Sequence, residues 1–257
     1  MKSLVKKFYN SKLFIFLRNN LNIKRIDINL NSINENVSIS DSFCWRTDNG
    51  YKTIFRFSDL LKNFYNINFS KVKIVFFNKK GEIIKQVKLS NLKIFNEIII
   101  DKKYLNNIED YGTFHIYHIS DGHIQNKIIL ANRCYTGFSI KGNLPSFVHG
   151  NTFSSYSSLE NGDQINSDLV QNILFKKNTY KVQNFFEKYE KTELLISNPT
   201  SQEVSFNCNE EIYKLRKFSC ILIKQTNKSL FTIKSNCLFL RPIIFNYKSN
   251  FLDVFHG

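Results

Sequence analysis

Apolar and polar residues alternate in many short stretches of this chain, and this alternation limits the folds open to it more than any other feature. In the first stretch, Ile26, Ile28 and Leu30 alternate with Asp27 and Asn29, which is the period-two pattern of a half-buried strand. Further strands are expected at 53–57, 71–77, 83–89, 97–100, 113–119, 127–130, 136–140, 179–186, 193–197, 203–208, 218–224, 230–234 and 243–247. The helical crossovers that a parallel sheet requires are missing between these stretches. The sequence therefore predicts a mainly β protein built from antiparallel, sandwich-like units.

A basic segment precedes the first strand. Residues 2–25 place Leu4, Phe8, Ile15 and Leu21 at roughly helical intervals and contain seven Lys or Arg residues without one acidic residue. This pattern predicts a short amphipathic helix over 1–25, which either packs on the β-body with its Lys stems exposed or lies on an anionic membrane surface. Two further short helices are expected, at 57–64 and 167–174, the first with Ser58 or Asp59 as its cap.

Several short segments occur twice, in the same order. Residues 49–53 match 178–182, 71–89 match 193–208, 98–100 match 221–223, Arg133 matches Arg241, and 147–150 match 254–257. Five ordered matches predict a tandem duplication. The predicted units cover 26–150 and 175–257, and a Ser- and Asn-rich connection over 151–174 joins them.

The net charge of +15 raises the question of a nucleic-acid partner. The basic residues are dispersed, however, and Lys is over-represented together with Asn, Ile and Phe, all residues of A/T-rich codons. We therefore expect a Lys-rich solvated surface and no nucleic-acid partner.

The five cysteines have no CxxC spacing, and three of them lie in or beside apolar runs. Such cysteines are typical of a reducing compartment, where they act as small buried apolar residues. No run approaches the ~18 apolar residues of a membrane span. We expect a cytoplasmic protein, at the inner face of the membrane if residues 2–25 bind lipid.

The first polar cluster lies in a turn-prone stretch at 40–50. It contains Asp41, the single tryptophan Trp45, Arg46, Asp48 and Asn49. An exposed tryptophan that stacks on a sugar ring, with Arg and Asn side chains bonding to the hydroxyls, is one interpretation. The other is a buried Trp45 beside a turn formed by residues 48–50.

The second cluster contains Arg133, His149 and Asn151. Arg133 has the planar donor geometry that suits a carboxylate or phosphate, and Asn151 is a further candidate ligand-binding residue. His149 is a candidate acid/base residue, with Asp41 or Asp48 as its carboxylate partner. Because the predicted repeat places His256 at the position of His149, a structural, hydrogen-bonded histidine is the alternative.

The third cluster contains His115, His118, Asp121 and His123, which are residue types that bind metals. If 113–119 is a strand, however, His115 and His118 point to opposite faces. Convergence of His118, Asp121 and His123 around the following turn is the alternative. We expect no metal site and no cofactor. Motifs for nucleotide binding, zinc proteases and serine hydrolases are also absent from the sequence.

The segments SDSFCWRTDNGYKTIFRFSDLL and LPSFVHGN resemble stretches of uncharacterised bacterial proteins that are encoded near genes for surface-polysaccharide assembly. The resemblance covers residues 40–151. It implies a role in glycan assembly and carries no reaction mechanism with it.

Three functions are compatible with these features. The first is a non-catalytic β-protein that binds a glycan intermediate or a partner protein in polysaccharide assembly. The second is an enzyme acting on an activated sugar, with His149 as acid/base and Arg133 on a sugar phosphate. The third is a peripheral membrane factor anchored by residues 2–25.

Overall fold

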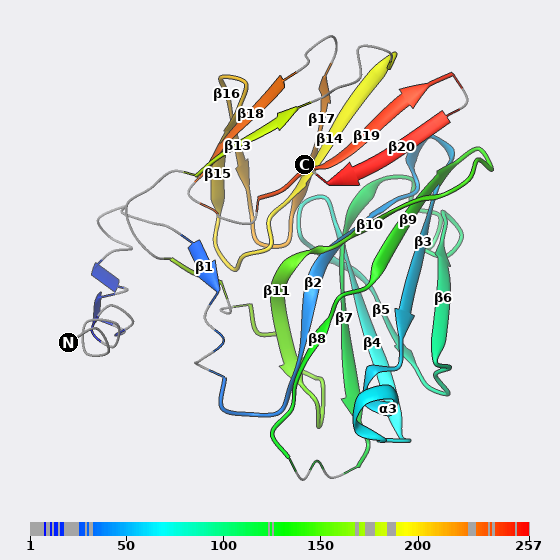
Figure 1. The fold of residues 1–257 in the computed structure, drawn as a ribbon, viewed down its shortest axis with the longest axis vertical. Helices are drawn as coiled ribbons and strands as arrows, with labels where there is room; N and C mark the ends of the chain where they lie inside the picture. The colour runs from blue at the N-terminus through cyan, green and yellow to red at the C-terminus, as the bar shows by residue number, and fades with distance from the viewer. Residues whose placement is uncertain are drawn as a thin grey trace.

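The computed structural model describes residues 8, 11, 13–14, 16–17, 26–28, 30, 33–122, 124, 126–167, 170–172, 178–183, 189–225, 230–235, 237, 240–249 and 251–256. The described chain is mainly β, as predicted (Figure 1). The predicted N-terminal helix falls largely outside the described residues, so the structure does not show it. Among the described residues, we find no helix long and apolar enough to cross a bilayer.

Two helical elements and twenty strands make up the described chain. The helical elements are the 3-10 turn η2 (Asp48–Gly50) and the helix α3 (Leu60–Tyr65). The strands are β1 (Ile26–Ile28), β2 (Val37–Arg46), β3 (Tyr51–Ser58), β4 (Ser70–Asn78), β5 (Ile83–Leu89), β6 (Phe95–Ile100), β7 (Tyr111–Ser120), β8 (Ile129–Asn132), β9 (Tyr135–Ile140), β10 (Ser146–His149), β11 (Asn151–Ser158), β12 (Val170–Asn172), β13 (Asn178–Gln183), β14 (Lys191–Ser197), β15 (Val204–Cys208), β16 (Glu211–Leu215), β17 (Cys220–Gln225), β18 (Leu230–Ser235), β19 (Ile243–Lys248) and β20 (Phe251–His256).

The strands form four larger sheets and the small pair β1–β12. Sheet 1 has the order β11-β2-β7-β4-β5, with β8 paired parallel to β2, and sheet 2 has the order β10-β9-β3-β6. Sheet 3 has the order β17-β14-β19-β20, and sheet 4 has the order β13-β18-β15-β16. All other strand pairs are antiparallel. The predicted helix over 167–174 is wrong, because residues 170–172 form β12.

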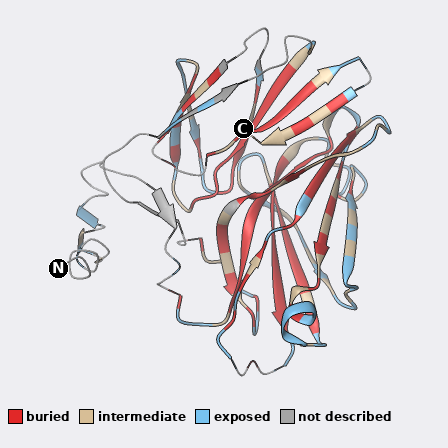
Figure 2. Ribbon diagram, viewed as in Figure 1, coloured by how far each residue is buried: buried red, intermediate tan, exposed pale blue. Residues whose placement is uncertain are grey.

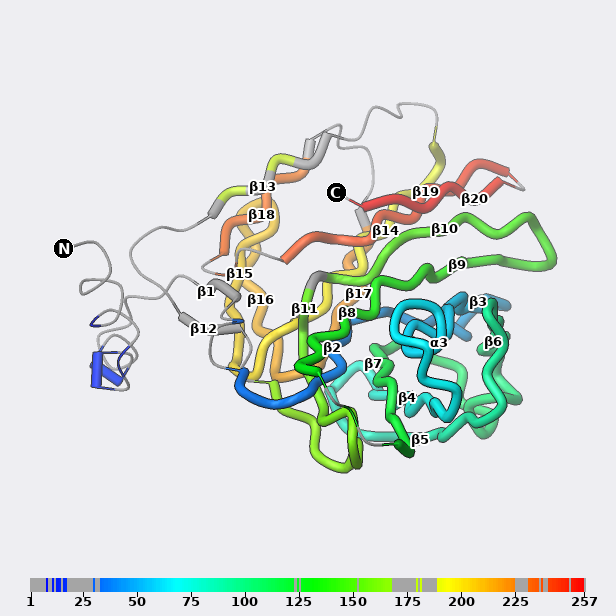
Figure 3. The backbone as a smooth tube through the Cα atoms, turned by 60° about the horizontal axis from the view of Figure 1, so that its bottom comes forward, coloured from blue at the N-terminus to red at the C-terminus, as the bar shows by residue number. Residues whose placement is uncertain are grey.

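Three apolar clusters fill the spaces between successive sheets. One, around Phe55 and Phe114, lies between sheets 1 and 2, and another, around Phe206 and Ile244, lies between sheets 3 and 4. The third joins Tyr51 and Phe138 of sheet 2 to Phe245 of sheet 3. Figures 1 and 3 show the matching arrangement, with β9 and β10 next to β19 and β20.

This packing corrects the prediction of sandwich-like units. A separate sandwich has a solvated outer face on each sheet. Here residues 192–197 of β14 are all buried, because one face of sheet 3 packs on sheet 4 and the other on the first half (Figure 2). The arrangement of the four larger sheets is closer to a four-bladed propeller than to a sandwich.

The two halves have the same connectivity, as the predicted duplication requires. Within sheet 1, four strands pair in the order β2-β7-β4-β5. In sheet 4, the strands pair in the corresponding order, β13-β18-β15-β16. Sheet 2, read as β6-β3-β9-β10, corresponds to β17-β14-β19-β20 of sheet 3. Strands that match in this scheme are called equivalent below, and the two halves are called the first and second repeat.

Three of the five predicted matches fall on equivalent strands. Residues 98–100 and 221–223 lie in β6 and β17, Arg133 and Arg241 precede β9 and β19, and 147–150 and 254–257 lead through β10 and β20. The last two are also in register: His149 lies opposite Tyr135, and His256 lies opposite Ile243, each the first residue of its strand.

The other two matches are wrong. Residues 49–53 lead into β3, whose equivalent is β14 rather than β13. Residues 71–89 form the β4–β5 hairpin within one sheet, whereas β14 and β15 belong to different sheets. The predicted boundary at 150 is also early, because β11 pairs with β2 and completes sheet 1. Short matches in an Asn- and Lys-rich chain are too frequent to determine register.

All five cysteines are buried and none forms a disulfide, as predicted. Burial raises the pKa of the Cys44 thiol to about 12, although Ser197 hydrogen-bonds to it. The cysteines therefore act as uncharged core residues.

Candidate functional site

Trp45 lies in the core and has no exposed face. Its exposed fraction is 0%, and its indole N–H donates to the Phe77 carbonyl at 3.0 Å. Gly112 of β7 makes this packing possible, because a Cβ there would come within 2.7 Å of the Trp45 ring. The interpretation of Trp45 as an exposed sugar-stacking residue is therefore wrong, and the alternative of a buried Trp45 is correct.

Arg46 is also buried, in a charged cluster that connects the two repeats. Its guanidinium contacts Asp48 and Glu193 at 2.7 Å each, and these are residues of different repeats. Its Cζ lies 4.1 Å from the centroid of the Tyr51 ring and 4.8 Å from that of Phe245. Arg46 thus connects the two repeats, and its Nε, Nη1 and Nη2 groups all donate to protein side chains rather than to an open site.

The cluster is closed by hydroxyl groups. Tyr51 and Tyr247 share a hydrogen bond of 2.5 Å, and the Tyr247 hydroxyl donates to Glu193 at 2.5 Å. Burial would raise the pKa of Glu193, but Arg46, Lys191 and Tyr247 together hold that pKa below its ordinary value. Asn49 has a positive φ of 51° at the turn and donates to Asp48, which is the turn chemistry offered as the alternative.

Asp41 and Arg133, both predicted as site residues, are brought together. Arg133 Nε lies 3.9 Å from Asp41 Oδ2, and the Arg133 side chain is half exposed whereas Asp41 is fully buried. Burial raises the pKa of Asp41 to about 7, against the lowering effects of the Phe153 N–H, Arg133 and Arg241. Arg133 belongs to the first repeat and Arg241 to the second, so Asp41 lies between the repeats, at a position that we call the junction.

His149 and Asn151 lie at the same junction. The His149 ring packs on Tyr135 at 4.4 Å between centroids, with the two ring planes tilted by 41°, and the His149 carbonyl accepts from Nε2 of His256. Asn151 donates to Ser197 Oγ at 3.2 Å and to the Arg241 carbonyl at 3.4 Å. In the described part of the chain, no hydrogen bond joins the His149 imidazole to Asp41 or Asp48.

His115 and His118, the two described histidines of the third cluster, do not share a metal site in the described structure. His115 and His118 are buried on opposite faces of β7, as predicted, and His123 lies outside the described residues. His118 Nδ1 donates to Asn132 at 2.7 Å. Within the described residues, no three His, Cys, Asp or Glu side chains are grouped closely enough to hold a metal ion.

His115 is expected to make folding sensitive to acid. It is fully buried beside Phe77 and Phe218, and burial, with Lys217 nearby, lowers its pKa to about 3. The folded pKa is below the unfolded value, so the stabilisation is complete above pH ~6.5 and is lost as the pH falls from there toward 3. Between pH 6 and 4, the free energy of unfolding of wild type should therefore fall by up to about 1.4 kcal/mol per pH unit more than that of His115→Gln. Urea unfolding measures both. Equal losses in both proteins would contradict this assignment.

A groove on the first repeat is an open concave site lined by several aromatic side chains. It lies between α3, β8 and the outer face of sheet 2, and has a volume of about 710 Å³. Its apolar lining includes Phe64, Tyr65, Phe95, Ile129, Tyr135 and Phe147, and Arg56 and Arg133 supply its guanidinium groups. We call it the aromatic groove.

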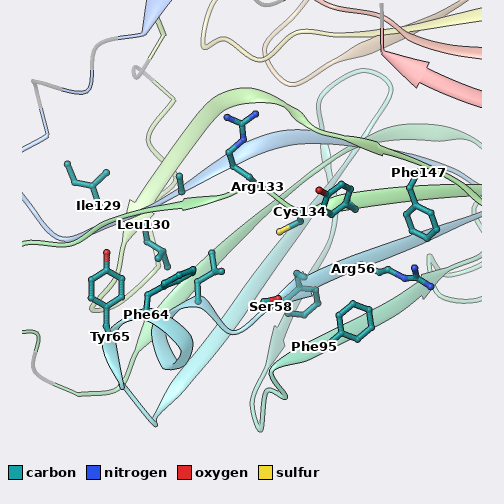
Figure 4. Close-up of a pocket in the computed structure, with 14 residues that line it drawn as sticks. Arg56, Ser58, Phe64, Tyr65, Phe95, Ile129, Leu130, Arg133, Cys134 and Phe147 are labelled. Atoms are coloured by element: carbon teal, nitrogen blue, oxygen red, sulfur yellow. The ribbon is translucent and has the colours of Figure 1, made fainter.

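The aromatic side chains of this groove are exposed to an unusual degree. Phe64 is 73% exposed, Phe95 57% and Tyr135 49%, whereas most large apolar side chains of the first repeat are buried. In Figure 4, Arg56 lies near Phe95 and Phe147, and Arg133 lies at the opposite rim with its guanidinium directed away from Phe64 and Tyr65. Exposed aromatic residues gathered in a concave site are typical of a recognition surface.

Local contacts on α3 and β3 fix the positions of the groove residues. Asp59 caps α3 by accepting from the Lys62 N–H at 3.1 Å, and Leu61 anchors the helix in the core, so Phe64 and Tyr65 are left on its open face. Arg56 on β3 forms an ion pair with Glu97 on β6 at 2.8 Å, and its Cζ lies 4.4 Å from the Phe147 ring centroid. The Phe95 ring centroid is 5.8 Å from the same Cζ, so the Arg56 guanidinium lies near two rings.

The second repeat shows what the same face looks like when it is covered. Arg56 pairs with Tyr135 across β3 and β9, and the equivalent pair across β14 and β19 is Leu195 with Ile243. Leu195 and Ile243 are buried against the first repeat. One face of the fold is thus aliphatic and covered in one repeat, and aromatic, charged and open in the other.

Sequence reasoning identified Arg133 but missed the aromatic residues of the groove. Phe95 and Ile99 lie on one face of β6 with Glu97, and are exposed. The one local signal for the groove in the sequence was this strand face, which holds both apolar and charged residues. Such a face does not distinguish a recognition surface from a strand that packs elsewhere in the fold.

Comparisons with known proteins add no relative: no protein family, no curated protein and no solved structure matches this chain.

Proposed function

We propose that this protein binds a glycan with an acidic group in the aromatic groove, as a non-catalytic component of surface-polysaccharide assembly. The observation that carries the proposal is the gathering of exposed aromatic rings and two guanidinium groups in one concave site. Aromatic rings stack on the apolar faces of sugar rings, and guanidinium groups bind carboxylates or phosphates.

The size of the groove supports a small ligand. Its volume of about 710 Å³ is within the usual range for sites that hold a compound of drug-like size, which is also the size of a short oligosaccharide. The overall charge of +15 favours an acidic ligand over a basic one.

The lining favours binding over acid–base catalysis. It contains no carboxylate and no imidazole among the described residues, and such groups are the usual proton carriers in sugar chemistry. Asp41 and His149, the candidates for an enzyme acting on an activated sugar, are outside this lining.

The peripheral membrane hypothesis stays a separate prediction, since residues 2–25 fall largely outside the described chain. It predicts that the protein floats with vesicles containing anionic lipid at low salt, where polybasic attraction is strongest.

Glycan arrays followed by calorimetric titration test the proposed function. Phe64→Ala and Tyr135→Ala should each weaken binding of a glycan hit about 3- to 10-fold, because each removes one stacking surface. Phe251→Ala is the matched control: Phe251 is 60% exposed but lies on β20, outside the groove lining, and its loss should leave affinity unchanged. Arrays without any hit, or equal losses in Phe64→Ala and Phe251→Ala, would reject the proposal.

A further inference from the structure

Of the two groove arginines, Arg133 is the one whose donor groups are held less tightly by the protein. Its side chain is 51% exposed, and its ion pair with Asp41, at 3.9 Å, is too long for a hydrogen bond. The other groove arginine, Arg56, is already held by Glu97 at 2.8 Å. Arg133 therefore has N–H groups available. Its Nε faces Asp41, and its guanidinium is directed away from Phe64 and Tyr65 (Figure 4).

Asp41 is fixed at one oxygen and unsatisfied at the other. Its Oδ1 accepts from the Phe153 N–H at 2.9 Å, whereas its buried Oδ2 has no hydrogen-bond partner in the described structure. A Cβ on Gly150 would come within 2.7 Å of Asp41 Cβ, so the β10–β11 connection packs closely on the base of the Asp41 side chain. The side chain is thus held at its Cβ and at Oδ1, and its charge state is what can change.

The charged and titratable groups around Asp41 come from both repeats. Arg133 and Arg241 precede the equivalent strands β9 and β19, and both act electrostatically on Asp41. The Cys134 thiol is also near Asp41. Burial and the charge of Asp41 raise the pKa of this thiol well above its ordinary value. His149 and His256 contact each other at the same junction, and burial lowers the pKa of His256.

We infer that Asp41 is a positioning residue for the aromatic groove: its carboxylate holds Arg133 at the junction, and its protonation releases the guanidinium to an acidic group of the ligand. This inference rests on the proposed function, because it assigns Arg133 to ligand binding. It also names the ligand class more narrowly, as a glycan with a carboxylate or phosphate group rather than a neutral one.

The Asp41 carboxyl group gains or loses its proton near neutral pH, so the release of Arg133 is expected in that range. Burial, the largest cause, raises the pKa of Asp41 to about 7, so the carboxyl group changes its charge in this range. An anionic ligand and the Asp41 carboxylate compete for one guanidinium. By linkage, binding of the anion must therefore raise the pKa of Asp41 further and cause proton uptake.

A ligand-free experiment tests the coupling of the two residues. In a carboxyl ¹³C NMR titration of the aspartates, the signal absent from Asp41→Asn is assigned to Asp41. It should titrate near neutral pH, and Arg133→Ala, which removes a cationic neighbour, should move its midpoint upward. A midpoint near 4, or one that Arg133→Ala leaves in place, would overturn the inference whether or not any glycan binds.

A ligand-binding experiment tests the consequence. Calorimetric titration with a glucuronate-containing disaccharide, with glucose 1-phosphate and with a neutral disaccharide at pH 6, 7 and 8 distinguishes a carboxylate from a phosphate ligand and both from a neutral sugar. The affinity of wild type for the acidic probe that binds should fall about 3- to 10-fold from pH 6 to 8, a change typical of a partly exposed ion pair. Asp41→Asn should bind with the affinity of wild type at pH 6 throughout.

His149→Gln is the control for a second side chain at the junction, and this variant should keep the pH dependence. A dependence retained in Asp41→Asn, or lost in His149→Gln, would refute the role of Asp41. If wild type binds none of the three probes at any pH, the proposed function fails for these ligands, while the NMR titration still decides whether Asp41 and Arg133 are coupled.

Discussion

Replacing Arg46 with Met is expected to lower the free energy of unfolding by about 3–5 kcal/mol, because it leaves the Glu193 carboxylate buried without its main partner. The side chains of Arg46 and Glu193 are each 1% exposed, and they come from different repeats. Lys191 stays within 2.5 Å of Glu193 and is partly exposed, so the loss should be nearer the lower end of this range.

Urea unfolding at pH 7 measures the effect, and the structure offers a matched control. Arg56 and Glu97 form a similar ion pair at 2.8 Å, but their side chains are 40% and 37% exposed. Arg56→Met should therefore cost no more than about 1 kcal/mol. Similar losses in the two variants would mean that Arg46 is not desolvated as described.

A double variant separates the ion pair from its surroundings. Arg46→Met combined with Glu193→Gln removes both buried charges, so its loss should be clearly smaller than the sum of the two single losses. Losses that simply add would show that the two residues act independently and that Arg46 does not connect the repeats through Glu193.

Replacing Trp45 with Ala is expected to cost a similar 3–5 kcal/mol, for a different reason. The substitution leaves a cavity among Phe43, Phe55 and Phe114, and removes the donor to the Phe77 carbonyl. Total stabilities of domains are about 5–15 kcal/mol, so this variant can fall close to the limit of folding.

Trp45→Phe keeps the test informative in that case. It retains most of the apolar volume and loses the indole N–H, so its cost should be about 1–3 kcal/mol. Under conditions where it is folded, it should bind the glycan hits of wild type with unchanged affinity, because Trp45 has no exposed face. Reduced affinity in folded Trp45→Phe would restore the hypothesis that Trp45 contacts the sugar.

Local patterns predicted most of the strands and one of the helix caps. The alternation at 83–89 and 243–247 corresponds to β5 and β19, and Asp59 caps α3 as expected. These features depend on residues that are near in sequence, where side-chain period and capping chemistry act directly. The register of the repeat was harder to predict from the sequence, because two of the five matches joined strands that are not equivalent.

The candidate site was predicted only in part. Asp41 and Arg133 were both selected and are in contact, although they are about ninety residues apart in sequence. Trp45 and Arg46 were selected for their chemistry, and that same chemistry is used inside the fold, in an aromatic core and a buried ion pair. Polar and aromatic residue types indicate strong interactions without showing whether the partner is a ligand or the protein itself.

By itself, the sequence determined the β class, the positions of most strands, the repeated Arg–His pair and the burial of the cysteines, because these follow from residue type and spacing. Only the tertiary structure decided which faces meet solvent. Alternation assigns Arg56 and Leu195 to equivalent faces of equivalent strands, but sheet packing covers Leu195 and leaves Arg56 open. Burial depends on what lies across the sheet, and those neighbours are distant in sequence.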